Sequence, residues 1–235
     1  MHPKHQLKRW LRYATHDLEL QDELNLLQLC QNDGEIYNRF YRELPVYASG
    51  MHAPIGAGPN RMNIYTVGRA SQAFALCLRS RSNPRPVLVS CDLLASSLRF
   101  AHQAACVFAA NGIFVWLQQS PVPASFLPGG IRRLACGGGV CITAGYPPDS
   151  YCGYLLYGPN GERLPENTCR TVAKKMSGID PFHGVLTTDF DTACDIGLIR
   201  MVRTPALAEP AAHKLATAPM PKRYPPGAEH AQSAH

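Results

Sequence analysis

The stretch VLVSCDLLASSLRFAHQAACVFAANGIFVWL, residues 87–117, decides the fold because it joins two short apolar runs through a helix. Its first run, VLVSC at 87–91, predicts a buried strand. The next segment predicts a helix over 96–110, which an Asn-Gly pair closes in the usual way. The second run, IFVWL at 113–117, predicts another strand. A strand, a helix and a strand in this order indicate a parallel βαβ unit.

The same alternation extends on both sides of this unit. Apolar residues at helical spacing, strand-like runs and Gly/Pro turns predict the remaining elements. In chain order these are helices at 17–31, 34–44 and about 60–78, a short helix at 131–135, strands at 139–143 and 154–157, a helix at 165–177, and a last helix from Asp189 that is interrupted near Gly197. The fold class is therefore α/β, with helices covering a mostly parallel sheet.

Composition restricts the class of protein. A chain of 235 residues with 46% apolar residues can bury a large core. The first residues, MHPKHQLKRWLRY, have no apolar core of a signal peptide, and no run is long enough to span a membrane, so a cytoplasmic location is expected. Nine scattered cysteines without a CxxC pair indicate reduced thiols rather than disulfides or a zinc site. The net charge of +6 would suit an anionic ligand, but the basic residues are dispersed, so neither nucleic acid nor a membrane is expected as a partner.

The chain divides into three parts by its patterns. Residues 1–45 form an N-terminal helical segment, and residues 46–203 form the α/β/α domain. Residues 204–235 are rich in Ala, Pro and His and have no periodicity, which predicts a flexible tail.

Several ordered segments carry a resemblance to a known family. They are EIYNRFYREL at 35–44, GAGPNRMNIYTVGRASQAFA at 56–75, FAHQAACVFAANGIFVW at 100–116, GVCITAGYPPDSYCGYLLYGPNGE at 139–162 and DFDTACDIGLI at 189–199. In sequence and spacing they resemble the first domain of the α-D-phosphohexomutases, the phosphoglucomutase and phosphomannomutase family, with the N-terminal helices most similar to the phosphoglucomutase/phosphopentomutase branch. The resemblance implies a three-layer α/β/α domain. It also implies a magnesium-dependent phosphoserine enzyme that moves a phosphoryl group between two hydroxyls of a sugar phosphate.

The family's serine lies in a loop that usually reads TASHNP. This chain matches the Thr and Ala at 143–144 and the final Pro at Pro148. The serine, however, falls on Gly145, the following His on Tyr146 and the Asn on Pro147. The resemblance therefore implies that the turn is retained while its nucleophile is lost.

Other polar positions of the family are also replaced. The loop's later Asn and Lys fall on Cys152 and Leu155, and the Arg of an Asp-Ser-Arg turn falls on Leu94. The Arg of the family's GTAGLRG segment falls on His52, which is expected to be an ordinary loop histidine. It is a weak substitute because histidine is only partly charged near neutrality. Tyr146 and Cys152 are candidate replacement nucleophiles, but ordinary packing is the preferred interpretation of both residues.

Two more features resemble functional sites, and both have a simpler interpretation. The Gly-Ala-Gly at 56–58 resembles a phosphate cradle, but a lone GxG is a weak signal and a packing turn is preferred. Asp189 and Asp191 are interpreted as a helix start rather than as metal ligands. The resemblance places the family's Mg²⁺ site in a second domain and its sugar specificity in further domains, so no cofactor is expected for this chain.

The expected function is therefore that of a phosphoglucomutase/phosphomannomutase first domain, from carbohydrate metabolism, that is truncated. Because the phosphoserine position is Gly145, such a domain is expected to be a pseudoenzyme that is inactive alone. Two alternatives stay open. One is a non-catalytic module that binds a sugar phosphate or an intact mutase, and the other is half of a split mutase completed by a second chain.

Overall fold

A computed structural model describes residues 2–47, 50–80, 85–92, 95–121, 123–146 and 151–203. The predicted tail at 204–235, Leu94 and Pro147–Pro148 of the family loop lie outside these residues. The elements in chain order are α1 (Pro3–Tyr13), α2 (Leu18–Cys30), α3 (Asp33–Phe40), β1 (Met51–Pro54), α4 (Ile64–Arg79), β2 (Val87–Cys91), α5 (Ala95–Ala110), β3 (Val115–Gln118), the 3₁₀ turn η1 (Ala124–Phe126), α6 (Leu127–Arg133), β4 (Gly138–Tyr146), β5 (Tyr151–Tyr157), α7 (Glu166–Ser177), α8 (Phe190–Asp195) and β6 (Ile199–Val202).

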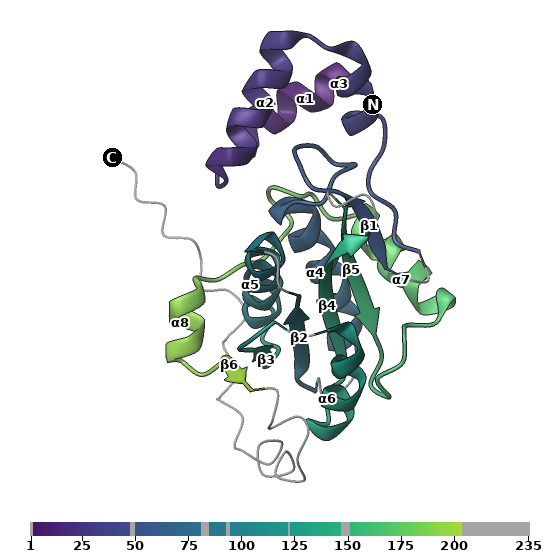
Figure 1. Ribbon diagram of the computed structural model, residues 1–235, viewed down its shortest axis with the longest axis vertical. Coiled ribbons are helices and arrows are strands. Elements are labelled where there is room, and N and C mark those ends of the chain that lie inside the picture. Colours follow the sequence, from purple (N-terminus) through teal and green to yellow (C-terminus); the bar gives the residue numbers. More distant parts are fainter. Residues whose placement is uncertain are drawn as a thin grey trace.

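The strands form one mixed sheet in the order β1-β5-β4-β2-β3-β6. The pairs β4–β2, β2–β3 and β3–β6 are parallel, whereas β5 is antiparallel to both β4 and β1. The expected α/β class with a mostly parallel sheet is confirmed (Figure 1). Because β1 and β4 are each antiparallel to β5, they point the same way as β2, and the carboxyl ends of all three meet at one edge.

Helices cover both faces of this sheet. Alternate strand residues such as Val89 and Leu117 pack with α4, α5, α7 and α8 in the larger apolar core. The opposite residues, such as Leu88 and Trp116, pack with Leu127 and other residues of α6 in a smaller core. Strand side chains point alternately to the two faces, so two apolar faces require two covering layers. The domain therefore has three layers, α/β/α.

The N-terminal helices α1–α3 lie past the carboxyl edge of the sheet, at the top of Figure 1. Trp10 is fully buried in their own apolar cluster, which also takes in Tyr65 of α4 and Phe182. The indole of Trp10 meets the ring of Phe182 edge-on at a centroid distance of 5.3 Å. The segment is therefore packed onto the domain through aromatic contacts.

The structure departs from the sequence-based expectations at several elements. The polar opening segment forms α1, and β1 arises where a loop was expected. The expected helix after Gly197 is the strand β6, because its apolar residues complete the edge of the sheet beside β3. The short helix expected at 131–135 begins earlier, at Leu127, because Pro128 occupies a first-turn position where its missing N–H is tolerated.

None of the helices in the described parts of the chain combines the length and the apolar character that a membrane crossing requires.

Candidate active site

The carboxyl ends of β1, β2 and β4 define one edge of the sheet, which is where ligands bind in open α/β folds. The sequence-predicted site residues Gly145 and Tyr146 lie at the end of β4. His52 lies on β1, two strands away, with β5 between them. The fold therefore brings the predicted positions to two strands that both flank β5, with His52 level with Thr143 rather than with Tyr146.

Gly145 sits at an irregularity in the β4–β5 pairing. Ala144 pairs with Cys152 and Tyr146 pairs with Tyr151, so Gly145 is an extra residue between two ladder positions. Bulges of this kind re-aim the chain at the ends of strands and are common beside active sites. The sequence predicted that the turn begins at this point, but the strand continues to Tyr146. The position that the family resemblance assigns to the phosphoserine therefore has a bulged backbone and no hydroxyl.

His52 and Thr143 flank Gly153, which pairs with both of them. A Cβ atom added to Gly153 would lie 2.9 Å from Thr143 Oγ1 and 3.1 Å from His52 Nε2. This crowding explains why glycine stands at that position. The two polar side chains therefore come from separate strands to one small area of the sheet.

His52 is a poor replacement for a cationic arginine. Burial lowers the pKa of His52, and the nearby positive charge of Arg163 lowers it further. The ordinary pKa of histidine is about 6.5, so a lowered value leaves the imidazole neutral at physiological pH. It therefore supplies a hydrogen-bonding group at the edge but not a stable positive charge.

Some buried hydroxyls near this edge lack hydrogen-bond partners within the described part of the chain. Thr143 Oγ1 on β4 and Ser97 Oγ in the first turn of α5 are both buried, and neither has a partner in the described part of the chain. Buried polar groups are nearly always satisfied, so such atoms call for an explanation such as a bound molecule. The sequence identified Thr143 only through the family loop and Ser97 only through the family's Asp-Ser-Arg turn, and it did not predict their lack of partners.

Cys152 does not offer a replacement nucleophile. Its side chain belongs to the larger apolar core, and burial raises its pKa to about 12. The thiolate is the reactive form of cysteine, so this thiol stays protonated and inert at neutral pH. The side chain of Tyr146 lies outside the described structure.

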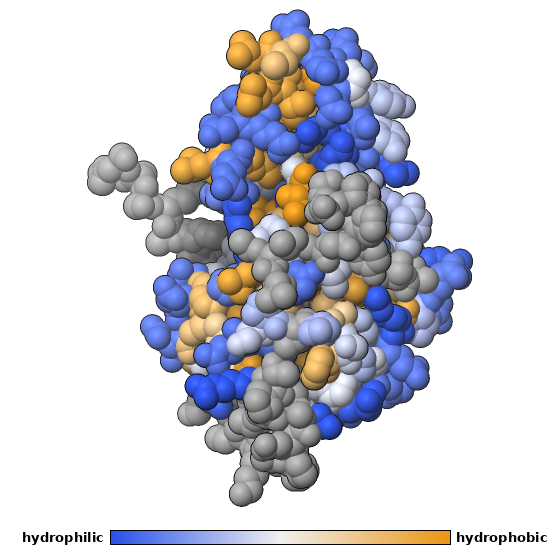
Figure 2. All heavy atoms as spheres, viewed as in Figure 1, coloured by the Kyte–Doolittle hydropathy of each residue, from blue (hydrophilic) through white to orange (hydrophobic). Residues whose placement is uncertain are grey.

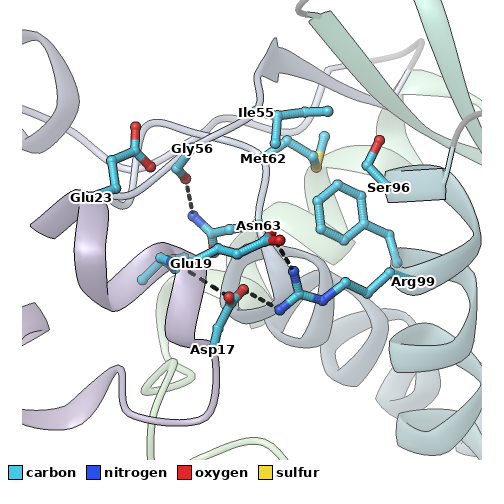
Figure 3. A pocket seen from close by; sticks show the side chains of 11 residues that line it. Asp17, Glu19, Glu23, Ile55, Gly56, Met62, Asn63, Ser96 and Arg99 are labelled. Carbon is cyan, nitrogen blue, oxygen red and sulfur yellow. Dashed lines mark hydrogen bonds and ion pairs between the residues drawn. The ribbon is translucent and has the colours of Figure 1, made fainter.

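A cavity of about 300 Å³ lies between α2, the loop after β1 and the start of α5 (Figure 3). Asp17 on its wall accepts a hydrogen bond from Leu20 N, and its carboxylate lies 2.6 Å from Arg99 of α5. The Gly-Ala-Gly loop at 56–58 also borders it, and Glu23 of α2 fills that loop by accepting a 2.6 Å hydrogen bond from Ala57 N. The expected packing turn is therefore occupied by a carboxylate of the same chain.

Asp189 and Asp191, which the sequence predicts at a helix start, lie at the start of α8. The carboxylate of Asp189 accepts hydrogen bonds from the backbone N–H and hydroxyl of Thr192 and caps α8. Across the described ranges, no three His, Cys, Asp or Glu side chains are grouped closely enough to hold a metal ion. The described residues therefore do not form a site that fits Mg²⁺.

A three-layer α/β/α domain with a bulged, glycine-containing strand end defines the class of protein. Residues 45–182 match the family model described as "Phosphoglucomutase/phosphomannomutase, alpha/beta/alpha domain I", and the chain belongs to this family.

Among curated relatives, the chain is 29% identical over 170 residues to a phosphoglucomutase of Staphylococcus haemolyticus, covering 72% of this chain and 30% of the relative. It is 31% identical over 165 residues to a phosphopentomutase of Mus musculus, covering 66% of this chain and 26% of the relative. The fold is similar to the open form of the phosphoglucomutase parafusin from Paramecium, with a TM-score of 0.53 and 15% identity over 69% of this chain and 34% of that one. The chain therefore spans less than a third of the length of these curated relatives.

Proposed function

We propose that this chain is a non-catalytic phosphohexomutase domain I, which binds a sugar phosphate at the carboxyl edge of its sheet without accepting a phosphoryl group there. The observation that carries the proposal is Gly145, which occupies the bulge at the end of β4 without a hydroxyl. Loss of the nucleophile from a covalent mechanism lowers the rate by about a millionfold. The neutral His52 and the inert Cys152 do not replace the missing group.

Binding without transfer is supported by the polar groups that remain at the edge. Within the described residues, the hydroxyls of Thr143 and Ser97 are buried without partners, and a ligand with several oxygens would satisfy them. A cytoplasmic location is part of this proposal, and the nine free cysteines support it because reduced thiols persist in that compartment.

The purified chain, incubated with glucose 1,6-bisphosphate and MgCl₂, tests the catalytic part. We expect intact-mass spectrometry to show no phosphoryl increment, because position 145 offers no acceptor oxygen. A Gly145→Ser variant is the matched control, since it restores only the hydroxyl. A stable phosphoryl increment on the unmodified chain, mapped by peptide sequencing to Thr143 or any other residue, would contradict the proposal.

A second candidate function is an interaction module that pairs with an intact mutase. The exposed leucines of α2 favour this candidate, because Leu18 is 80% exposed and Leu29 is 81% exposed. Figure 2 shows apolar surface gathered over the N-terminal helices. We expect a pull-down with an intact phosphoglucomutase to weaken in Leu29→Ser but not in Leu186→Ser, which changes an exposed leucine elsewhere. Equal capture by both variants would count against this candidate.

A further inference from the structure

Arg61 is a buried cation in the turn between β1 and α4. Arg61 is only 8% exposed. The guanidinium donates from Nη1 to the carbonyl of Asn60 at 3.1 Å and from Nη2 to Asn38 Oδ1 of α3 at 3.2 Å. Both acceptors are neutral, so the hydrogen bonds position the group without neutralising its charge.

Arg42, just after α3, reaches the same turn from the other side. Its Nε donates to Asn60 Oδ1 at 3.3 Å, and its guanidinium lies over the ring of Tyr41 at 5.0 Å. Asn60 is therefore held by Arg42 through its side chain and by Arg61 through its carbonyl. This shared partner places two guanidinium groups around one buried asparagine.

The neighbouring carboxylates are already engaged by a third arginine. Arg39 Nη1 lies 2.6 Å from Glu23 and Arg39 Nε lies 3.0 Å from Glu35. In the described parts of the chain, neither Arg42 nor Arg61 has a carboxylate within ion-pair distance. Both carboxylates therefore pair with Arg39, and neither forms an ion pair with Arg42 or Arg61.

A buried charge without a counter-ion is unfavourable. Burial lowers the pKa of Arg61 and the charge of Arg39 lowers it further, and this outweighs the opposing effect of Glu35, Tyr151 and Glu23; the group stays protonated at neutral pH. Taking an ion out of water costs several kcal/mol unless a partner of opposite charge is present. Guanidinium groups suit phosphate oxygens because their N–H donors form a planar fork, and each arginine here has N–H groups left to donate.

The position of the pair relates it to the candidate active site. Tyr151 lies within electrostatic range of Arg61 and starts β5, where it pairs with Tyr146 beside the Gly145 bulge. The pair therefore borders the carboxyl edge of the sheet.

We propose that Arg42 and Arg61 form a binding site for the phosphate group of a phosphate monoester. The two positive charges match the dianion that such a group carries near neutral pH. This inference rests on the proposed function, because it names the residues that would hold the phosphate of the sugar phosphate. It does not depend on Gly145 or on any transfer chemistry.

Calorimetric titration at low ionic strength tests the site, with inorganic phosphate, glucose 1-phosphate and glucose as probes. We expect the full chain to bind both phosphates and not glucose. Arg42→Gln is the main variant because Arg42 is exposed, so we expect the variant to fold. It should weaken phosphate binding by about tenfold or more, the effect of one charge-assisted hydrogen-bonding group. Arg79→Gln, an exposed arginine at the end of α4, is the control for the same change in net charge and should change the affinity less than about twofold.

Arg61→Lys provides a second variant that keeps the charge but removes the planar fork. We expect it to weaken binding as well, and if it does not fold, Arg42→Gln still decides. Equal affinity in the unmodified chain and Arg42→Gln, or equal losses in Arg42→Gln and Arg79→Gln, would overturn the site. If glucose 1-phosphate binds the unmodified chain and Arg42→Gln alike, the site fails while the proposed function stands. If inorganic phosphate binds through Arg42 but glucose 1-phosphate does not bind, the site stands and the proposed function fails.

Discussion

Gly50 holds a left-handed backbone conformation, with φ at +102°, directly before β1. A Cβ atom there would lie 2.1 Å from the carbonyl oxygen of Tyr154 on β5. A side chain at position 50 would therefore meet both backbone strain and steric overlap with Tyr154. We expect Gly50→Ala to destabilise the fold by about 3 kcal/mol, measured by urea unfolding.

Gly112 is the matched control for this prediction. It also has a positive φ, at +72°, but a Cβ atom there meets nothing within 4 Å. We expect Gly112→Ala to cost only the conformational strain, about 1 kcal/mol. Equal losses at the two positions would show that the contact with Tyr154 has no energetic effect.

The lowered pKa of His52 makes stability depend on pH. The unfolded chain binds a proton at the ordinary histidine pKa of about 6.5, whereas the folded chain binds it at a lower pH. The stability is therefore full above about pH 6.5 and falls as the pH drops toward the folded pKa. We expect the slope of unfolding free energy between about pH 7 and pH 5 to be smaller in His52→Gln. An unchanged slope would mean that the imidazole is solvated in the fold.

At the scale of the element, the regular patterns could be predicted from the sequence. The strands and helix of 87–117 were predicted within two residues, because continuous apolar runs and helical spacing depend only on neighbouring residues. The strands β1 and β6 were missed because each has four residues and depends on pairing with a distant partner. The missing hydroxyl at Gly145 was visible in the sequence. The Arg42–Asn60–Arg61 contact was not, since α3 and the turn before α4 meet only in the fold.

Asn63 shows how one side chain can fix both a helix start and the loop before it. Its Oδ1 accepts from the backbone N–H of Tyr65 and Thr66 and caps α4, and its Nδ2 donates to the carbonyls of Gly56 and Gly58. We expect Asn63→Ala to cost about 3 kcal/mol in thermal or urea unfolding, because it removes a cap and leaves buried carbonyls unpaired.

Two comparisons separate the contributions of this asparagine. Asn32→Ala removes the exposed cap of α3, where the side chain of Asn32 accepts from Glu35 N, and should cost about 1 kcal/mol. Asn63→Asp keeps the capping oxygen and loses the donor to the loop. Its loss of stability should therefore lie between those of Asn32→Ala and Asn63→Ala. If Asn63→Asp were as stable as the unmodified chain, the loop carbonyls would not need the donor.

For the whole molecule, the main question is how firmly α1–α3 are held to the domain. The aromatic cluster around Trp10 supplies the apolar contact. Around it, Arg9 of α1 pairs with Asp180, Arg69 of α4 lies 2.8 Å from Glu43, and Arg99 of α5 pairs with Asp17. These ion pairs join segments distant in sequence, so they connect docking of the helices to the charge state of the carboxylates.

Acid should weaken this docking. Burial raises the pKa of Asp180, but hydrogen bonds from the backbone N–H groups of Phe182 and His183 and the pair with Arg9 outweigh it, so the pKa of Asp180 lies below its ordinary value. The contribution is therefore complete above the unfolded pKa of about 4 and is lost as the pH falls through the lower folded value. Arg9 and Asp180 are partly exposed, 31% and 37%, so the pair is worth only about 1 kcal/mol.

Tryptophan emission can report this step, because Trp10 and Trp116 are the two tryptophans of the chain. In a Trp116→Phe background only Trp10 emits, and its contact with Phe182 is lost if the helices separate from the domain. At pH 7, we expect the emission of Trp10 to move to longer wavelength at a lower urea concentration in Asp180→Asn than in the chain with Asp180. This change should occur at a lower urea concentration than the loss of circular dichroism. Asp33→Asn is the control, because Lys4 and Asp33 are exposed by 55% and 69% within the helical segment and contribute close to nothing. Emission and circular dichroism that changed together in every variant would show instead that the helices and the α/β/α domain unfold as one unit.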